Sequence, residues 1–495
     1  MTRSDGITRR TLLGSAAALP ALGLPAARAA AQEGRRALLV VLPLIRNDYV
    51  DDSGTSTPNI KELEGNSLRF DRVIPECMPA LPVRRTLITG MRSFPFRDWE
   101  QTEGMPAVPG YNPVWDWQPV MTETMRAAGV ETVYVTDNPI VDGPRFPEVR
   151  RAGGSVEAAG RGGIKDEIAA IKRATKATER TFRVGIEELR GLSGFLGIDP
   201  FDPVDAVEAP PIYVKPGEVE DEGIGPMDGR LAELRFSDGE RDELRSAYRD
   251  HVEAVDGWVG RLMGEVPDDV LVFMLGDIGI ALGEHDYIGR GAPTSHRDSY
   301  EIPFLIRDPD GRKAGDDVDW YASTHDVAPT ILSFMGITIP GKMWGEDLTA
   351  LLDDVDEDDL YHRPYSISAS GSLIVVRDSR WLMVADREEI ERRMYDDDEE
   401  VEDDITRYED IANEDTGQLT EMSQVAVTVA GGTLPEFGPD GALRPPPQRG
   451  DDDGDDDGIP NDFDAVDNDE PDDNDDREAL QFDGRDPEGG ELAIP

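Results

Sequence analysis

The sequence contains a single cysteine, Cys77, among 495 residues. One thiol cannot form a disulfide within the chain, and it cannot supply the several thiolates of a metal cluster. Lysine is also scarce, since only seven of the 50 basic residues are lysine. The stability of the fold must therefore come from a hydrophobic core, with or without bound ions.

Positive charge is scarce overall, because 103 acidic residues oppose 50 basic ones and give a formal net charge of −53. Such a surface repels nucleic acid and anionic lipid, which excludes nucleic acid as a partner. The acids are spread through the body of the protein, since residues 451–478 hold only 16 of the 103. We expect a protein of a halophilic prokaryote, because salt screens the repulsion between like charges.

Long hydrophobic runs are also missing. Residues 1–30 contain Arg9-Arg10 and then an Ala/Leu/Pro-rich stretch up to Ala27–Ala29, which is typical of a twin-arginine signal with a small-residue cleavage site. Pro20 and Pro25 interrupt this stretch, and its apolar part is shorter than the ~20 residues of a spanning helix. We therefore expect an exported protein, extracellular or at the cell surface, with no transmembrane segment after signal removal.

Short apolar runs alternate with helical patterns in the rest of the chain. A helix is expected after the cap-like pair Thr57-Pro58, and a longer one begins at Ser237. This alternation predicts an α/β fold with a largely parallel or mixed central sheet covered by helices on both faces. The runs predicted as buried strands are residues 37–42, 131–136, 194–198, 270–275 and 302–306.

The domain organisation follows from changes in this pattern. Residues 31–363 are expected to form the α/β domain and residues 364–415 a small antiparallel subdomain. Residues 416–450 are interpreted as a linker, and residues 451–495 form an acidic tail.

Two interpretations of the acidic tail stay open. Charge repulsion favours disorder and simple solvation. The alternating carboxylates also resemble the calcium-binding repeats of thrombospondin type 3. In those repeats, carboxylate oxygens are hard ligands that bind Ca²⁺, so the resemblance implies a calcium site in the tail. The candidate calcium ligands are Asp453, Asp455, Asp457, Asp462 and Asp464.

Several motifs occur in the order in which they appear in one enzyme family. Thr57-Pro58-Asn59 precedes Ala80-Leu81-Pro82-Val83-Arg84 and a Thr89-Gly90 ending. Residues 276–285 and 325–330 then follow, as GDIGIALGEH and HDVAPT, and Gly345-Glu346-Asp347 continues the series. Together they resemble the sulfatase family of the alkaline phosphatase superfamily. The resemblance implies an alkaline-phosphatase-like fold and metal-dependent hydrolysis of sulfate or phosphate esters.

The catalytic positions implied by this resemblance are mostly substituted. Ala80 takes the place of the nucleophile, and a methyl group cannot attack an ester. Pro43 and Ile278 stand where the family has metal ligands, so Asp277 alone remains of that set. Val204 replaces a substrate-facing histidine. These substitutions predict that the divalent metal of the family is absent from the core site here.

The anion-binding positions are retained. The resemblance places Arg84, Arg290 and His285 where the family contacts the sulfate or phosphate group, and two guanidinium groups suit a tetrahedral oxyanion. The alternative is that both arginines pair with acids such as Asp277. Structural roles are favoured for His285 and also for His325.

Other candidates for catalytic residues are weaker. Cys77 lies three residues before the nucleophile position of the family motif, and moving it there would spoil the spacing to Thr89-Gly90. We therefore interpret it as a buried apolar side chain. His251 and His362 lie in an amphipathic helix and a loop, without partners that suggest catalysis.

Two functional hypotheses result. The first is a pseudoenzyme that binds a sulfated or phosphorylated small molecule or glycan without cleaving it. The second is an active ester hydrolase whose metal site uses residues outside the motifs, such as Asp48, Asp51 and Asp52. An active paralogue is compatible with either hypothesis as a partner.

Overall fold

The computed structural model describes most of the chain between residues 34 and 435. The described residues are 34–51, 54–103, 105–106, 108–155, 164–206, 237–283, 288–290, 297, 300–353, 360, 363–371, 373–378, 381–386, 391–396, 416–432 and 434–435. The predicted signal, His285 and the calcium candidates of the tail lie outside them.

An eight-stranded sheet forms the centre of the protein, with the order β10-β2-β9-β6-β1-β5-β3-β4. Every pairing is parallel except those of β9, which runs antiparallel to both β2 and β6. The largely parallel sheet confirms the predicted fold class. The strands are β1 (Arg36–Leu42), β2 (Leu68–Ile74), β3 (Thr132–Thr136), β4 (Val149–Arg150), β5 (Phe195–Asp199), β6 (Val270–Gly276), β9 (Phe304–Arg307) and β10 (Asp317–Ser323).

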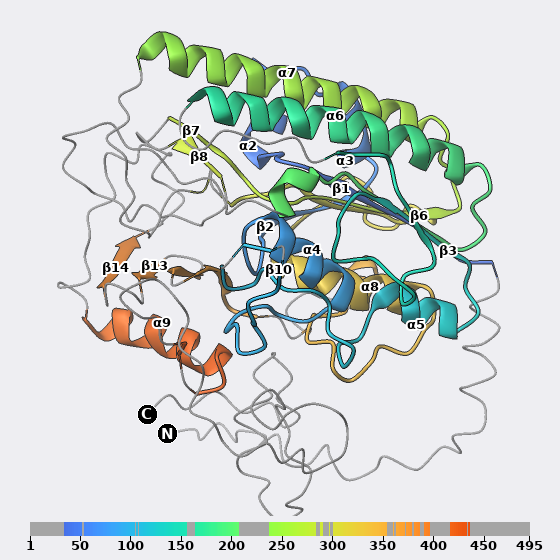
Figure 1. The fold of residues 1–495 in the computed structure, drawn as a ribbon. Coiled ribbons are helices and arrows are strands. Elements are labelled where there is room, and N and C mark those ends of the chain that lie inside the picture. Colours follow the sequence, from blue (N-terminus) through green and yellow to red (C-terminus); the bar gives the residue numbers. More distant parts are fainter. Residues whose placement is uncertain are drawn as a thin grey trace, which may run out of the picture.

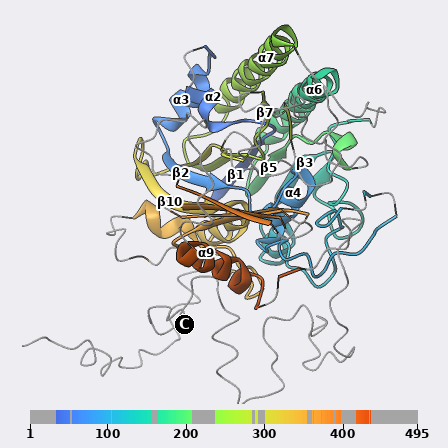
Figure 2. The same cartoon turned by 90° about the vertical axis from the view of Figure 1, so that its left-hand side faces the viewer.

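Helices cover both faces of the sheet, so the α/β body has three layers (Figures 1 and 2). One layer contains α6 (Ile164–Leu189) and α7 (Asp238–Met263), which lie side by side, with α2 (Asn47–Asp51) and α3 (Pro58–Glu64). The opposite layer contains α4 (Ala80–Thr89), α5 (Met121–Ala127) and α8 (Val327–Phe334). Short elements are η2 (Pro203–Ala206), η4 (Thr324–Asp326), η5 (Leu348–Leu352) and the two-stranded pair β7 (Ala281–Leu282) and β8 (Ile288–Gly289).

The long helix predicted from Ser237 is confirmed. Ser237 and Glu240 form a capping box at the start of α7, in which each side chain bonds to the backbone N–H of the other residue. The predicted apolar stripe of α7 faces the sheet and is fully buried. It consists of Leu244, Tyr248, Val252, Val255, Val259 and Leu262.

The start of α3 differs from the expectation that Thr57 caps it. The hydroxyl of Thr57 donates to the carbonyl of Val50 at 2.7 Å. The carboxylate of Asp256, on α7, instead accepts the backbone N–H groups of Asn59 and Ile60 at 2.9 and 2.8 Å. A distant acid therefore satisfies the free N–H groups of this helix and fixes it to α7.

The expected antiparallel sheet near the C-terminus is present, with the order β11-β12-β13-β14. Its strands are β11 (Ser366–Ser370), β12 (Leu373–Arg377), β13 (Trp381–Asp386) and β14 (Glu391–Asp396). The linker prediction is wrong over Thr416–Val429, which form helix α9 and pack against β12 and β13. The apolar residues at Leu419, Met422, Ala426 and Val429 recur every three or four positions, which is the spacing of a helix with one buried face.

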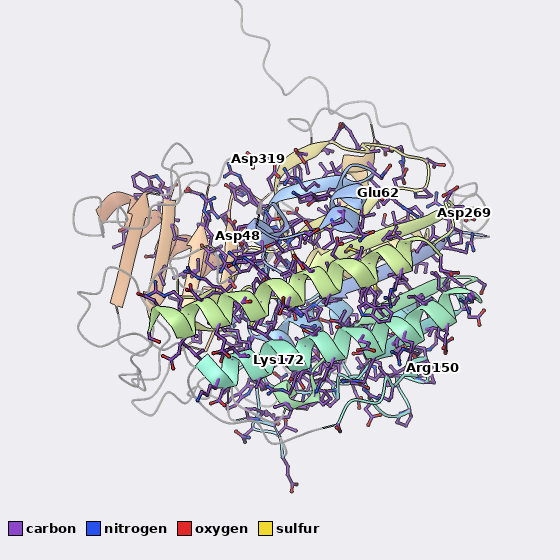
Figure 3. All side chains as sticks on the ribbon, turned by 90° about the horizontal axis from the view of Figure 1, so that it is seen from above. Asp48, Glu62, Arg150, Lys172, Asp269 and Asp319 are labelled. Atoms are coloured by element: carbon purple, nitrogen blue, oxygen red, sulfur yellow. The ribbon has the colours of Figure 1, made fainter. Side chains whose placement is uncertain are left out.

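Charged side chains lie on the outside of the described body. Asp48, Glu62, Asp269 and Asp319 are all exposed, and they lie over separate parts of the fold (Figure 3). None of the helices in the described ranges is long and apolar enough to cross a membrane.

Gly345 allows a close approach between two backbone segments. A Cβ atom at this position would collide with the carbonyl group of His325 and with Cα of Asp326. Because those atoms belong to a buried backbone, they cannot move aside as a flexible side chain would. The glycine of the Gly345-Glu346-Asp347 motif is therefore required by packing.

We predict that Gly345→Ala destabilises the protein by about 2–4 kcal/mol, because the added methyl group forces the backbone of η4 to move. The free energy of unfolding, measured with denaturant in high salt, tests this. Gly341→Ala is the matched control, since nothing lies within 4 Å of a Cβ atom there. Equal losses in the two variants would contradict the packing argument.

Candidate active site

The candidate site lies at the carboxyl ends of the parallel strands β1, β5 and β6, where ligands bind in open α/β sheets. Helix α4 begins at this edge, and Ala80 is its first residue. Ala80 is 6% exposed. The position that resembles the nucleophile position is thus at a helix N-terminus facing the site, but it carries no reactive atom.

Arg84 lies one helical turn after Ala80 and forms two buried ion pairs. Its Nε atom donates to Oδ1 of Asp199 at 3.0 Å, and its Nη1 atom donates to Oδ2 of Asp277 at 2.5 Å. All three side chains are at most 3% exposed. Arg84 therefore joins the ends of β5 and β6.

The remaining contacts of Arg84 use up most of its other donors. Nη2 donates to the carbonyl of Pro200 at 3.0 Å, and Nη1 is 3.4 Å from the carbonyl of Ala80. The ring of Phe201 lies beside the guanidinium, with 5.3 Å between Cζ and the ring centroid. The four hydrogen bonds of Arg84 use four of the five N–H groups of the guanidinium, so an oxyanion that accepts two hydrogen bonds from Arg84 would have to displace a protein acceptor.

Asp277 is held by backbone groups as well as by Arg84. Its Oδ1 atom accepts the N–H groups of Leu44 and Ile278 at 2.6 and 2.7 Å. Leu44 has a φ of 56°, an uncommon conformation for leucine, which directs its N–H group at the carboxylate. The turn at Pro43 and Leu44 therefore presents a hydrogen-bond donor to Asp277 where the family resemblance implies a metal ligand.

These residues do not fit a divalent cation. Both oxygens of Asp277 are occupied by N–H donors, and strand β1 contributes no carboxylate at its end. Within the part of the chain that the structure describes, no group of three or more His, Cys, Asp or Glu side chains is arranged to hold a metal ion. Divalent cations such as Ca²⁺ and Mg²⁺ require several oxygen ligands in a defined geometry.

The alternative metal ligands behind β1 are only partly described. Asp48 is exposed, and its two oxygens accept from Nε and Nη2 of Arg46 at 2.9 and 2.6 Å. The side chains of Asp51 and Asp52 lie outside the described residues. Asp48 is therefore the exposed partner of the buried Arg46 in an ion pair.

Two residues of α7, which the sequence analysis did not assign to the site, fix the turn after β1. The hydroxyl of Tyr248 donates to the carbonyl of Leu44 at 2.7 Å. Nε2 of His251 lies 2.8 Å from the carbonyl of Pro43, and Nδ1 lies 2.8 Å from the hydroxyl of Thr175. A carbonyl can only accept, so Nε2 of His251 carries a proton and donates it. The sequence could have predicted the burial of His251, because it lies next to Val252 in the apolar stripe of α7.

Burial lowers the pKa of His251 to about 4, although the carbonyl of Pro43 and the charge of Asp277 oppose this. The imidazole is therefore neutral near pH 7, with the proton on Nε2. Burial also raises the pKa of Asp199 above its ordinary value, and the positive charge of Arg84 opposes this rise.

Arg290 and Val204 lie beside this centre. Arg290 follows β8 and is 7% exposed, and its Nε atom is 3.7 Å from Oε2 of Glu167 on α6. Val204 is buried in η2, where its N–H group donates to Asp202 at 3.2 Å. Both arginines predicted to bind an anion thus form ion pairs, Arg84 with the predicted Asp277 and Arg290 with Glu167.

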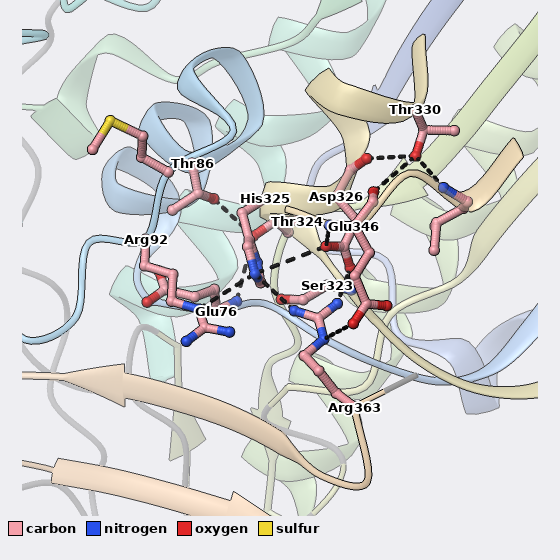
Figure 4. A network of polar contacts seen from close by, with 12 residues as sticks. Glu76, Thr86, Arg92, Ser323, Thr324, His325, Asp326, Thr330, Glu346 and Arg363 are labelled. Atoms are coloured by element: carbon pink, nitrogen blue, oxygen red, sulfur yellow. Dashed lines mark hydrogen bonds and ion pairs between the residues drawn. The ribbon is translucent and has the colours of Figure 1, made fainter. Parts of the chain in front are cut away.

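His325 belongs to a separate buried network between the two sheets (Figure 4). Its Nε2 atom accepts from Nη1 of Arg363 at 2.7 Å and lies 3.4 Å from Nε of Arg92. Asp326 pairs with Arg363 and accepts the N–H group of Glu346 at 2.7 Å. Burial and the two neighbouring arginines lower the pKa of His325 well below its ordinary value. This motif therefore has a structural role.

Cys77 is also structural. Its side chain is fully buried in the core between β11, β12 and α9, and burial raises the pKa of the thiol well above its ordinary value. The neighbouring Met78 donates its N–H group to the carbonyl of Ala369 on β11 at 2.8 Å. A buried neutral thiol is a poor nucleophile.

Comparison with known proteins matches two family models. Residues 169–337 match the model described as Sulfatase, and residues 283–423 match the model described as N-sulphoglucosamine sulphohydrolase, C-terminal. The first match includes Asp199 and Asp277 but begins after α4. The assignment of Ala80 therefore rests on the spacing of its motif and on its place at the start of α4.

Individual relatives agree with these matches. The N-acetylglucosamine-6-O-sulfatase of Bacteroides thetaiotaomicron is 31% identical over 153 residues, which cover 28% of this chain and 27% of that protein. The chain thus spans about a quarter of the length of this curated relative.

Two solved structures show the same fold. A 2-O GAG sulfatase superposes with a TM-score of 0.62 at 16% identity, covering 79% of this chain and 91% of that one. A phosphonate monoester hydrolase from Silicibacter pomeroyi superposes with a TM-score of 0.54 at 17% identity, covering 79% and 94%.

We predict a specific pH dependence from His251. Because its pKa is about 4 when folded and 6.5 as an ordinary side chain, its contribution to stability is complete above pH 6.5 and decreases as the pH falls toward 4. The limiting slope is about 1.4 kcal/mol per pH unit. His251→Gln should therefore be less stable than the wild type at pH 7, and this difference should narrow at lower pH.

Denaturant unfolding at several pH values from 7.5 to 4.5 measures the effect. Thr175→Val is the control, because it removes the hydroxyl next to Nδ1 of His251 but keeps the titrating group. A constant difference between wild type and His251→Gln across this range would show that His251 does not act through its protonation.

Proposed function

Because the chain belongs to the sulfatase family of the alkaline phosphatase superfamily, we propose that it is an exported member that binds sulfated or phosphorylated groups without hydrolysing them. The reaction of the family is sulfate ester hydrolysis. The observation that carries the proposal is the ion pair of Arg84 with Asp277, next to the methyl group of Ala80.

Hydrolysis needs an attacking group and a cation that stabilises negative charge in the transition state. Ala80 offers no attacking group, and Arg84 neutralises the one acid retained from the implied metal site. Restoring a hydroxyl alone would leave this ion pair unchanged. The missing nucleophile at Ala80 and the missing metal site at Asp277 therefore both support the proposed loss of catalysis.

Anion binding is assigned to Arg290 in this proposal. The resemblance places Arg290 where the family contacts the sulfate or phosphate group, whereas Arg84 contacts Asp199 and Asp277 at 3.0 and 2.5 Å. The guanidinium of Arg290 suits the charge-assisted hydrogen bonds that a sulfate or phosphate oxyanion accepts. The printed name of the Bacteroides relative suggests a sulfated amino sugar as the first ligand to try.

Export is proposed from Arg9-Arg10 and the stretch that follows them. Cell fractionation tests it, since a protein retained in the cytoplasm would contradict a twin-arginine signal.

We predict that the purified protein does not hydrolyse aryl sulfate or aryl phosphate esters in high salt with Ca²⁺, Mg²⁺ or Mn²⁺, and that Ala80→Thr does not either. The reason is that neither the added cations nor the Ala80→Thr substitution breaks the ion pair between Asp277 and Arg84. Release of the aryl group is followed by absorbance, with an active family member in the same buffer as a positive control. Activity of the wild type that a chelator abolishes would overturn the proposal and favour a metal site outside the described residues.

We further predict that Arg290→Gln weakens binding of a sulfated amino sugar by roughly tenfold or more, which is the loss expected for one charge-assisted contact. Isothermal titration calorimetry measures the affinity. Arg150→Gln is the control, because Arg150 is an exposed residue of β4 whose nearest acid, Glu188, is 3.8 Å away. Equal affinities in the two variants would remove Arg290 from the binding site.

A further inference from the structure

We propose that the guanidinium of Arg84 replaces the divalent cation of the family as the positive charge at the centre of the site. This inference rests on the proposed non-hydrolytic function and concerns how the site is held together. The fold of this chain would then need no metal at the carboxyl ends of β5 and β6.

The contacts of Arg84 are those of a central cation. Carboxylates at the ends of two strands, Asp199 and Asp277, point at the guanidinium from β5 and from the segment after β6. The carbonyl oxygens of Pro200 and Ala80 add two further acceptors. Oxygen atoms from four separate positions thus surround one buried positive charge, as oxygen ligands surround a hard metal ion.

The surroundings of Asp277 favour a guanidinium over a metal ion. The two backbone N–H groups of Leu44 and Ile278 occupy Oδ1, which leaves Oδ2 for a single cationic partner. A second carboxylate at the end of β1 is missing, since Pro43 and Leu44 stand there. The single charge of Arg84 and the two N–H donors together occupy both oxygens of Asp277, so this carboxylate has no oxygen left for a metal ion.

The position of Arg84 explains why it can take this role. It lies on the first turns of α4, whose N-terminus faces the strand ends, and the side chain spans the distance from the helix to both acids. The family resemblance implies that an arginine at this place contacts the ester group. Here the same side chain points into the acids and is 1% exposed.

The test compares thermal unfolding of the full chain in EDTA with unfolding in millimolar Mn²⁺ or Mg²⁺. We expect Arg84→Ala to lose roughly 5–10 °C in EDTA, because two buried carboxylates lose their cation. Divalent cations should restore part of this loss. Equilibrium dialysis should then find one more Mn²⁺ bound per chain in Arg84→Ala than in the wild type.

Arg85→Ala is the matched control, because Arg85 is the next residue of α4, is also buried, and pairs with the single acid Asp98. Its loss of stability should not respond to divalent cations. If Arg84→Ala does not fold, the double variant Arg84→Met/Asp277→Asn decides, since it removes one charge of each sign and should recover a folded protein.

Three results would overturn the inference: no extra Mn²⁺ in a folded Arg84→Ala protein, equal metal responses of Arg84→Ala and Arg85→Ala, or a double variant no more stable than Arg84→Met. These results would leave the predicted absence of hydrolysis untouched. Conversely, ester hydrolysis by the wild type would contradict the proposed function without deciding which cation Asp199 and Asp277 contact.

Discussion

The site depends on one constraint, that a carboxylate buried at the end of a sheet must have a positive partner and hydrogen-bond donors. Asp199 ends β5 and Asp277 follows β6, the two strands on either side of β1, and both side chains are almost inaccessible to water. Arg84 supplies the charge for both, and backbone N–H groups supply the remaining donors to Asp277. The arrangement of α4 against the sheet is therefore fixed by electrostatics as well as by apolar packing.

This constraint extends to the turn after β1 and, through it, to α7, which contacts neither acid. The N–H group of Leu44 reaches Asp277 only because its backbone adopts a positive φ, which is unfavourable for leucine. Tyr248 and His251 on α7 hold the same turn through its carbonyl groups. The helix layer on one face, the ends of the strands and α4 on the other face thus form one connected polar unit. A change of charge at its centre has to be accommodated by all three layers.

Most of the α/β body could be predicted from the sequence, because its buried strands are short continuous apolar runs and α7 has a regular apolar stripe. β2 and β10 were missed, since Arg69, Asp71, Arg72 and Asp319 interrupt their apolar pattern. At the site, the sequence predicted which catalytic groups are replaced. It left open whether Arg84 binds an anion or pairs with Asp277, because that choice depends on contacts between residues nearly 200 positions apart. His251 was passed over because its partners come from Pro43 and α6.

The motifs that survive explain how the family resemblance can persist whether or not this chain cleaves an ester. Gly345 is needed for backbone packing, and His325 and Asp326 receive hydrogen bonds from Arg363 and from the backbone of Glu346. These residues support the fold whether or not an ester is cleaved, so losing them would cost stability in any descendant. A nucleophile or a metal ligand carries no such cost once another group neutralises the site. Sequence similarity in such a protein therefore reports on the conserved fold. Whether it catalyses a reaction has to be judged from the side chains at the carboxyl ends of the strands.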